Sequence, residues 1–162
     1  MKKIIVITGT PGTGKSTLAK LLTQKLKLPR LDLHHYYQQL SVKYNTQKKC
    51  YDLDYAKFEK LVQQKLQNHP NGLILDSHVA HHLPKKLVKL CIVLTCSNLK
   101  ILERRLKQRK YPAQKTKENL QAEIFQTCLL EAQQQGHNLI VFDTSTLAAA
   151  IIVKKLLQKI KP

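Results

Sequence analysis

The sequence predicts an α/β fold in which helices cover both faces of a five-stranded parallel sheet. A glycine-rich loop at residues 9–16 separates a short β-branched run from a stretch with helical spacing. Short apolar runs then alternate with helical patterns along the rest of the chain. With 162 residues, 43% of them hydrophobic, the chain has the size and composition of one globular domain, residues 1–162.

The first strand is predicted over residues 4–7, Ile-Ile-Val-Ile, and leucines at helical spacing from residue 18 to residue 26 predict the first helix. The loop between them fits the phosphate-binding pattern G-x-x-x-x-G-K-[ST]. Backbone N–H groups of such a loop, and the positive end of the next helix, bind phosphate oxygens. A chance glycine turn is the alternative, and the flanking strand and helix argue against it. The predicted nucleotide-binding residues are Pro11, Gly12, Thr13, Gly14, Lys15, Ser16 and Thr17.

Two of these residues have specific expected roles. Lys15 is expected to reach the β- and γ-phosphates of ATP, and the Ser16 hydroxyl is expected to bind Mg²⁺. Both roles need the lysine and the hydroxyl at the end of the loop, where the helix begins.

The other elements follow in order from the apolar pattern. Residues 29–33 predict a second strand, residues 34–53 a helical turn followed by a loop, and residues 55–66 an amphipathic helix. Residues 68–72 break that helix. Further strands are predicted at 73–76, 90–95 and 139–142. Helices are predicted from residue 99 to residue 106, from 120 to 135 and from 145 to 160, with a break at 110–112.

An acidic residue, Asp76, ends the third strand, at the sheet edge where such folds bind ligands. In phosphate-loop proteins an Asp in this place holds Mg²⁺ directly or through water, so Ser16 and Asp76 are the predicted metal ligands. His78 follows two residues later and could orient a water or a phosphate as a neutral imidazole. The alternative is a turn histidine with no role.

His81 and His82 follow at a spacing from His78 that metal sites also use. No further soft ligand lies near them in the sequence, so a surface or core role is favoured over a metal site.

Eight basic residues and one acid lie between Lys100 and Lys117. Arg105 and Arg109 are four residues apart on one helix face, so both could meet the same polyphosphate. We expect them to bind the nucleotide and to stabilise charge on the transferred group, although a solvated basic face has the same pattern.

The chain carries 28 Lys and Arg against 10 Asp and Glu, a net charge of +18. Such a surface attracts polyanions, and a lysine-rich solvated surface explains the charge equally well. The four cysteines form no C-x-x-C pair and are expected to be buried or free thiols in a reducing compartment. No apolar run has the length of a membrane span, and no signal peptide precedes the first strand, so a cytoplasmic protein that does not bind membranes is expected.

Residues 7–16, 75–84 and 105–125 resemble the adenylate kinase isoenzyme six family, the small archaeal and eukaryotic nuclear kinases tied to small-ribosomal-subunit maturation. The family's Asp-x-His is matched by Asp76 and His78. Its lid segment is matched by Arg105, Leu106, Arg109, Tyr111, Lys115, Glu118, Asn119 and Glu123.

The resemblance implies a P-loop nucleoside monophosphate kinase fold with a nucleoside-monophosphate arm at about 34–66 and a short lid at about 105–118. It implies transfer of the γ-phosphoryl group of Mg·ATP to AMP, dAMP or CMP, with accompanying ATPase activity. The catalytic residues would be Lys15, His78, Arg105 and Arg109. The alternative is an ATPase switch that binds a ribosomal protein or rRNA of the small subunit, in the nucleus if the protein is eukaryotic.

The chain departs from the family pattern at two places. Lys110 replaces the lid glycine, which costs backbone freedom in a moving segment. Asp32-Leu33-His34-His35 replaces Asn-x-x-Asp, so the arm carries His35 in place of an acid and the preferred acceptor stays open.

Overall fold

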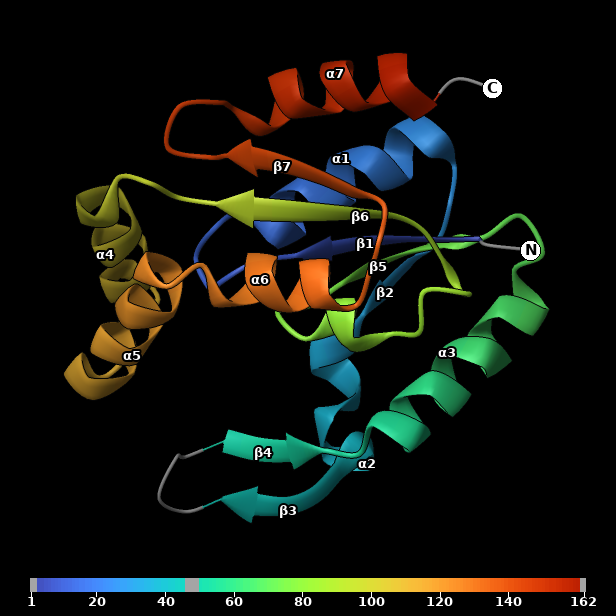
Figure 1. Cartoon of the computed structure of the whole chain (residues 1–162), viewed down its shortest axis with the longest axis horizontal. Coiled ribbons are helices and arrows are strands. Elements are labelled where there is room, and N and C mark those ends of the chain that lie inside the picture. Colours follow the sequence, from blue (N-terminus) through green and yellow to red (C-terminus); the bar gives the residue numbers. More distant parts are fainter. Residues whose placement is uncertain (1–2, 46–49, 161–162) are drawn as a thin grey trace.

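The computed structural model describes residues 3–45 and 50–160. A five-stranded parallel sheet in the order β2-β5-β1-β6-β7 forms its centre, which confirms the predicted fold class (Figure 1). The strands are β1 (Ile4–Thr8), β2 (Arg30–Asp32), β5 (Leu73–Asp76), β6 (Val88–Thr95) and β7 (Leu139–Asp143). Every side chain of β1 is buried, as expected for the central strand.

Helices cover both faces of this sheet. On one face α1 (Lys15–Leu26) and α7 (Ala149–Ile160) pack on Ile5, Ile7 and Ile74. On the other face, α3 (Tyr55–Asn68) and α6 (Thr127–Gln134) pack on a second apolar cluster that includes Ile4 and Val6. Successive side chains of β1 therefore point to opposite faces of the sheet and pack into two separate cores.

Two further helices lie beyond the carboxyl ends of β6 and β7 (Figure 1). They are α4 (Leu99–Gln108) and α5 (Ala113–Ile124), and the predicted lid, 105–118, falls on the end of α4, the turn and the first half of α5. Leu102 and Leu106 bury one face of α4 in a small core with Cys96. The helical pattern of the leucines thus places the basic face of α4 toward the sheet edge and solvent.

The segment predicted as a helical turn and loop contains more structure than expected. A 3₁₀ turn, η1 (Leu33–Tyr36), and the short α2 (Tyr37–Leu40) confirm the helical part. The loop part was wrong, because β3 (Ser41–Asn45) and β4 (Cys50–Leu53) form an antiparallel two-stranded sheet. The strands are five and four residues long and pair only with each other, apart from the main sheet, so no long apolar run marks them in the sequence. The lysines at 48 and 49 lie outside the described residues.

Two helix boundaries also differ from the prediction. The helical face expected from residue 120 to residue 135 is two helices, since Gln126 between α5 and α6 has a left-handed φ of 51°. The last helix begins at Ala149 and not at Ser145, because the Ser145 N–H and hydroxyl both donate to Asp143 Oδ1. Hydroxyl and amide side chains compete with helical hydrogen bonds in this way. No described helix is long and apolar enough to cross a membrane.

Candidate nucleotide-binding site

The glycine loop turns sharply against the end of β6. Gly9 has a φ of 144°, and a Cβ atom there would lie 2.3 Å from the Leu94 carbonyl oxygen. Gly14 has a φ of 92° and is the residue directly before α1. Only glycine tolerates both the close approach and the backbone conformation. The loop pattern therefore has a steric basis in this chain.

Lys15 folds back over the loop. Its Nζ donates to the Gly9 carbonyl at 2.8 Å and to the Thr10 carbonyl at 3.0 Å. Burial, with a smaller contribution from the Arg109 charge, lowers the pKa of Lys15 to about 8. The present acceptors of this amine are two neutral carbonyls. A phosphate in their place would favour the charged form of Lys15, because it is an anion.

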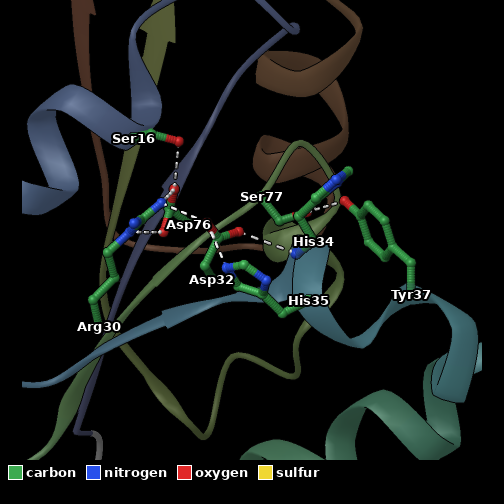
Figure 2. Close-up of polar contacts among 8 residues, drawn as sticks. All are labelled: Ser16, Arg30, Asp32, His34, His35, Tyr37, Asp76 and Ser77. Carbon is green, nitrogen blue, oxygen red and sulfur yellow. Dashed lines mark hydrogen bonds and ion pairs between the residues drawn. The ribbon is translucent and has the colours of Figure 1, made fainter.

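Ser16 and Asp76 lie together, as the metal prediction requires. The Ser16 hydroxyl donates to Asp76 Oδ2 at 3.2 Å, and Asp76 is only 3% exposed (Figure 2). A hydroxyl and a carboxylate are hard oxygen donors of the kind that Mg²⁺ prefers. The pair therefore fits Mg²⁺ by its chemistry.

The carboxylate of Asp76 already has a cationic partner. Arg30 Nε donates to Asp76 Oδ1 at 2.7 Å and Arg30 Nη2 donates to Asp76 Oδ2 at 2.9 Å, while Nη2 also reaches Asp32 Oδ2 at 2.8 Å (Figure 2). The sequence interpretation missed this arginine. Its role depends on the sheet order, because β2 pairs with β5 so that Asp32 lies opposite Asp76. Two neighbouring carboxylates need a cation, and Arg30 lies on the same strand face as Asp32.

His78 follows Asp76 at the same edge and contacts the predicted arm. Its Nδ1 lies 3.2 Å from the Tyr37 hydroxyl, which also lies 2.8 Å from Ser77 Oγ. His78 keeps part of its surface exposed, but desolvation of its ring, followed by the Lys15 charge, lowers the pKa of His78 to about 4. Burial raises the pKa of Tyr37 to about 12. Both groups are therefore neutral near pH 7, and Tyr37 is a second residue that the sequence interpretation missed.

The two predicted arginines border one cavity of about 400 Å³ beside the loop. Arg105 is tied in place: its Nη1 donates to Thr144 Oγ1 at 3.1 Å and to the Gly12 carbonyl at 3.4 Å, and its Nη2 donates to the Thr144 carbonyl at 3.0 Å. Arg109 is exposed. The residues around the cavity include Gly12, Thr13, Gly14, Thr17, Arg105, Arg109, Thr144 and Leu147.

A buried acid connects the lid to the loop. Glu123, 7% exposed, accepts from Thr10 Oγ1 at 2.5 Å and from the Cys96 N–H at 2.6 Å. It therefore joins α5, the glycine loop and the end of β6. In the sequence it had a place in the lid segment but no role, and only the fold reveals these partners.

Comparisons with known proteins agree with this geometry. The family described as AAA domain matches residues 5–126. The protein named "Putative adenylate kinase" of Methanocaldococcus jannaschii is 33% identical over 97% of this chain and 85% of its own length. The adenylate kinase isoenzyme 6 homolog of Schizosaccharomyces pombe is 34% identical over 86% of this chain and 79% of its own length.

A solved structure adds a likeness of fold. Deoxyadenosine kinase from M. mycoides superposes with a TM-score of 0.59 at 16% identity, over 96% of this chain and 97% of that one. At that identity the likeness concerns the fold alone. The matched glycine loop, the Asp76–Ser16 pair and the identity to the curated relatives agree: the chain belongs to the adenylate kinase isoenzyme 6 family.

Proposed function

We propose that the protein is a nucleoside monophosphate kinase that transfers the γ-phosphoryl group of Mg·ATP to AMP or a similar nucleotide. The single observation that carries the proposal is the Lys15–Ser16 end of the loop, with the Ser16 hydroxyl 3.2 Å from Asp76, in a chain of this family. The names of the relatives support a kinase of the adenylate type.

The residues would act mainly by positioning and by neutralising charge, as phosphoryl transfer requires. Lys15 and the loop amides would hold the donor phosphates, and Arg105 and Arg109 would stabilise charge on the transferring group. Bound Mg²⁺ would neutralise charge on the phosphates, and Ser16 and Asp76 would hold it. Arg30 binds both carboxylate oxygens of Asp76 and would compete with the ion for them.

The acceptor would enter between the loop and the arm, which carries the exposed His34 and His35 and the half-buried Tyr37. Candidate acceptors are AMP, dAMP and CMP. An acceptor screen tests the proposal: ATP and Mg²⁺ are incubated with each nucleoside monophosphate and the diphosphates are separated by chromatography. We expect at least one acceptor to give its diphosphate far faster than ATP is hydrolysed alone. If no acceptor gives diphosphate beyond the ADP that ATP yields alone, the kinase assignment is rejected.

An accompanying ATPase activity is the second candidate. Neutral His78, 3.2 Å from the Tyr37 hydroxyl, is able to accept a hydrogen bond from a water near the γ-phosphate. Slow hydrolysis without an acceptor, accelerated by a macromolecular partner, would support a switch in small-subunit maturation.

A basic surface far from the loop supports a ribosomal protein or rRNA partner for that switch. Lys89, which lies in β6, and Lys159, on α7, border one hollow of about 550 Å³ that Ile5, Leu90 and Leu139 also line. Lys154 and Lys155 are exposed on the same helix, and Lys161 lies outside the described residues. The lysines at 89, 154, 155 and 159 do not line the loop cavity, so nucleotide binding does not account for them. The free thiols of Cys91, Cys96 and Cys128 suit a cytoplasmic or nuclear protein, which we include in the proposal.

A further inference from the structure

Three side chains from two segments that are distant in the sequence lie close together. His81 and His82 lie in η2 (Ala80–His82), and Glu131 comes from α6, fifty residues further along the chain. The candidate ligand atoms of the three residues all lie within 4.8 Å of one another. The sequence disfavoured a metal site here because no further soft ligand lay near the two histidines, and the fold supplies a carboxylate in that place.

The three donors converge on one point. His81 Nε2 lies 2.7 Å and His82 Nε2 lies 3.5 Å from the same oxygen, Glu131 Oε2. Two imidazole nitrogens and one carboxylate oxygen are the protein ligands of many zinc sites that keep an open fourth position. In a tetrahedral site with metal–ligand bonds of 2.0–2.1 Å, two ligand atoms lie about 3.3 Å apart. The distance of 3.5 Å between His82 Nε2 and Glu131 Oε2 is close to that value. The distance of 2.7 Å between His81 Nε2 and Glu131 Oε2 would have to grow by about 0.6 Å. Glu131 is 40% exposed and has room for that movement.

The surroundings orient the first histidine as metal sites do. His81 is 1% exposed, and its other ring nitrogen, Nδ1, lies 2.8 Å from the hydroxyl of Thr8. A metal-bound histidine usually places its second ring nitrogen on such a partner, which fixes the ring orientation. The His81 carbonyl accepts from His137 Nε2 at 2.7 Å, so the backbone of this turn is held as well.

The protonation states also suit a cation. Burial lowers the pKa of both His81 and His82, and the Glu131 carboxylate opposes that effect. Metal binding needs the neutral form of an imidazole, and burial favours that form. Lys85 and Lys86 precede β6 near this turn, and Tyr55 packs its ring on His82 at a centroid distance of 4.7 Å.

We propose that His81 Nε2, His82 Nε2 and the Glu131 carboxylate form a site for Zn²⁺ or a similar imidazole-binding divalent ion, separate from the Mg²⁺ ligands Ser16 and Asp76. The ordinary alternative is a hydrogen bond from neutral His81 to Glu131 that joins η2 to α6. In that case Thr8, His81 and Glu131 satisfy one another without an ion. The two alternatives differ in whether the three residues bind an added divalent ion. The answer does not depend on the kinase assignment.

The test is a titration of the untagged full chain with Co²⁺, in the absence of nucleotide, followed by visible absorption. We expect one equivalent of Co²⁺ to bind and to give the intense absorption bands of four- or five-coordinate Co²⁺. Added Zn²⁺ should displace the bound Co²⁺, whereas added Mg²⁺ should not. Zn²⁺ should also raise the melting temperature of the chain, because it binds the folded state.

Two variants locate the site. His82→Gln and Glu131→Gln should each weaken Co²⁺ binding by about 100-fold or more, since even the partners of a metal ligand contribute 10–100-fold. Because His82 is partly exposed, the His82→Gln variant is expected to fold, even if Glu131→Gln disturbs the packing of α6. Far-UV circular dichroism checks the fold of both variants. His35→Gln is the matched control, because His35 is an exposed histidine 3.7 Å from the carboxylate of Asp32.

Two results would overturn the proposal. One is the absence of intense Co²⁺ bands in the unmutated chain at a few-fold molar excess of metal. The other is binding that survives His82→Gln in the folded protein, or that falls equally in His35→Gln.

Discussion

The two sides of the candidate site are held in different ways. The loop side, residues 9–17 with Arg105 and Thr144, is held largely by neutral backbone acceptors: Lys15 donates to two loop carbonyls and Arg105 to carbonyls and a hydroxyl. The arm side, residues 30–45 with 76–78, is held by charge: Arg30 forms hydrogen bonds with both oxygens of Asp76 and with Asp32.

This difference predicts unequal costs when ligands enter. Lys15 and Arg105 are charged donors with neutral acceptors, whereas the bonds of Arg30 join two charged partners. A hydrogen bond that involves a charged group contributes about 1.5–3 kcal/mol net, and bonds between two ionised groups are among the strongest. Phosphates can replace the carbonyl partners of Lys15 with charged ones. A metal ion at Asp76 must instead compete with an arginine for both carboxylate oxygens. The loop side is therefore close to its working form, whereas on the arm side ligands compete with existing ion pairs.

The largest expected effect is at Lys15. Lys15→Met should lower turnover by about 10²–10³-fold, because it removes a charge that acts on the transferring group. The fold should persist, since the Nζ bonds only to loop carbonyls. Steady-state diphosphate formation measures the effect, and Lys20→Met, on the exposed side of α1, is the control. Near-normal turnover in Lys15→Met would reject the assignment of the loop side.

Arg30 tests the arm side. Arg30→Gln should lower the Mg²⁺ concentration needed for half-maximal metal binding to the ATP complex by about tenfold, because the competing charge-assisted bonds are gone. Titration calorimetry of the complex with Mg²⁺ measures this without reference to activity. Lys25→Gln, an exposed change of equal charge on α1, is the control. An unchanged or increased Mg²⁺ requirement in the folded Arg30→Gln variant would contradict the competition.

His78 tests whether the arm side positions water. His78→Gly should reduce ATP hydrolysis by about tenfold while ATP affinity changes little, because the ring would orient a group at the γ-phosphate and would not anchor the nucleotide. Hydrolysis assays and a nucleotide-binding titration compare the two. Equal losses in both would assign His78 to structure.

The same residue gives a pH dependence with a definite sign. The pKa of His78 is about 4 in the folded chain and 6.5 for an ordinary histidine, so between these values the unfolded chain binds more protons. The His78 contribution therefore makes the folded state less stable as the pH falls from 6.5 toward 4, and has no effect above 6.5. The melting temperature of His78→Gly should fall less than that of the unmutated chain over this range.

The basic surface should be independent of both sides. Replacing Lys154, Lys155 and Lys159 by Gln should weaken RNA binding and flatten its salt dependence, because each lost phosphate contact releases fewer counterions. Kinase turnover should change little, since these residues lie on α7 and outside the loop cavity. Filter binding at several salt concentrations decides the point. If the unmutated chain retains no RNA near physiological salt, the charge serves solvation only.

The smallest expected effect is at the lid turn, where Lys110 has a left-handed φ of 56°. A residue with a side chain pays about 1–2 kcal/mol in this conformation, and glycine avoids that cost but loses more entropy on folding. Lys110→Gly should therefore raise the melting temperature by about 2–4 °C, the shift expected for 1 kcal/mol in a chain of this size. Lys107→Gly, inside α4, should lower it. A lower melting temperature for Lys110→Gly would show that the turn does not strain the lysine.

The loop side could be predicted from the sequence because its parts are local. One strand, eight loop residues and one helix follow each other directly, and glycine is the only residue whose backbone allows the turn at Gly14. Four of the five strands were predicted for the same reason, since each is a short apolar run, whereas β2 has only Leu31 between two charged residues.

The arm side and the metal cluster could not be predicted in this way. Arg30 meets Asp76 only because β2 pairs with β5, and Glu131 meets His81 across fifty residues. The hairpin of β3 and β4 was missed because its strands are short and no long apolar run marks them. Pairings between distant segments depend on sheet order and helix packing, which local patterns do not encode.

The measurement that tests the central claim most directly follows the γ-phosphorus of ATP in the unmutated chain. ATP labelled at the γ-position is mixed with Mg²⁺ and the best acceptor, and label in nucleoside diphosphate is compared with label in free phosphate. We predict that most of the label enters the diphosphate, and that Lys15→Met lowers the transfer by about 10²–10³-fold. Label that appears only as free phosphate, with every nucleoside monophosphate tried, would contradict the kinase assignment and leave the ATPase switch.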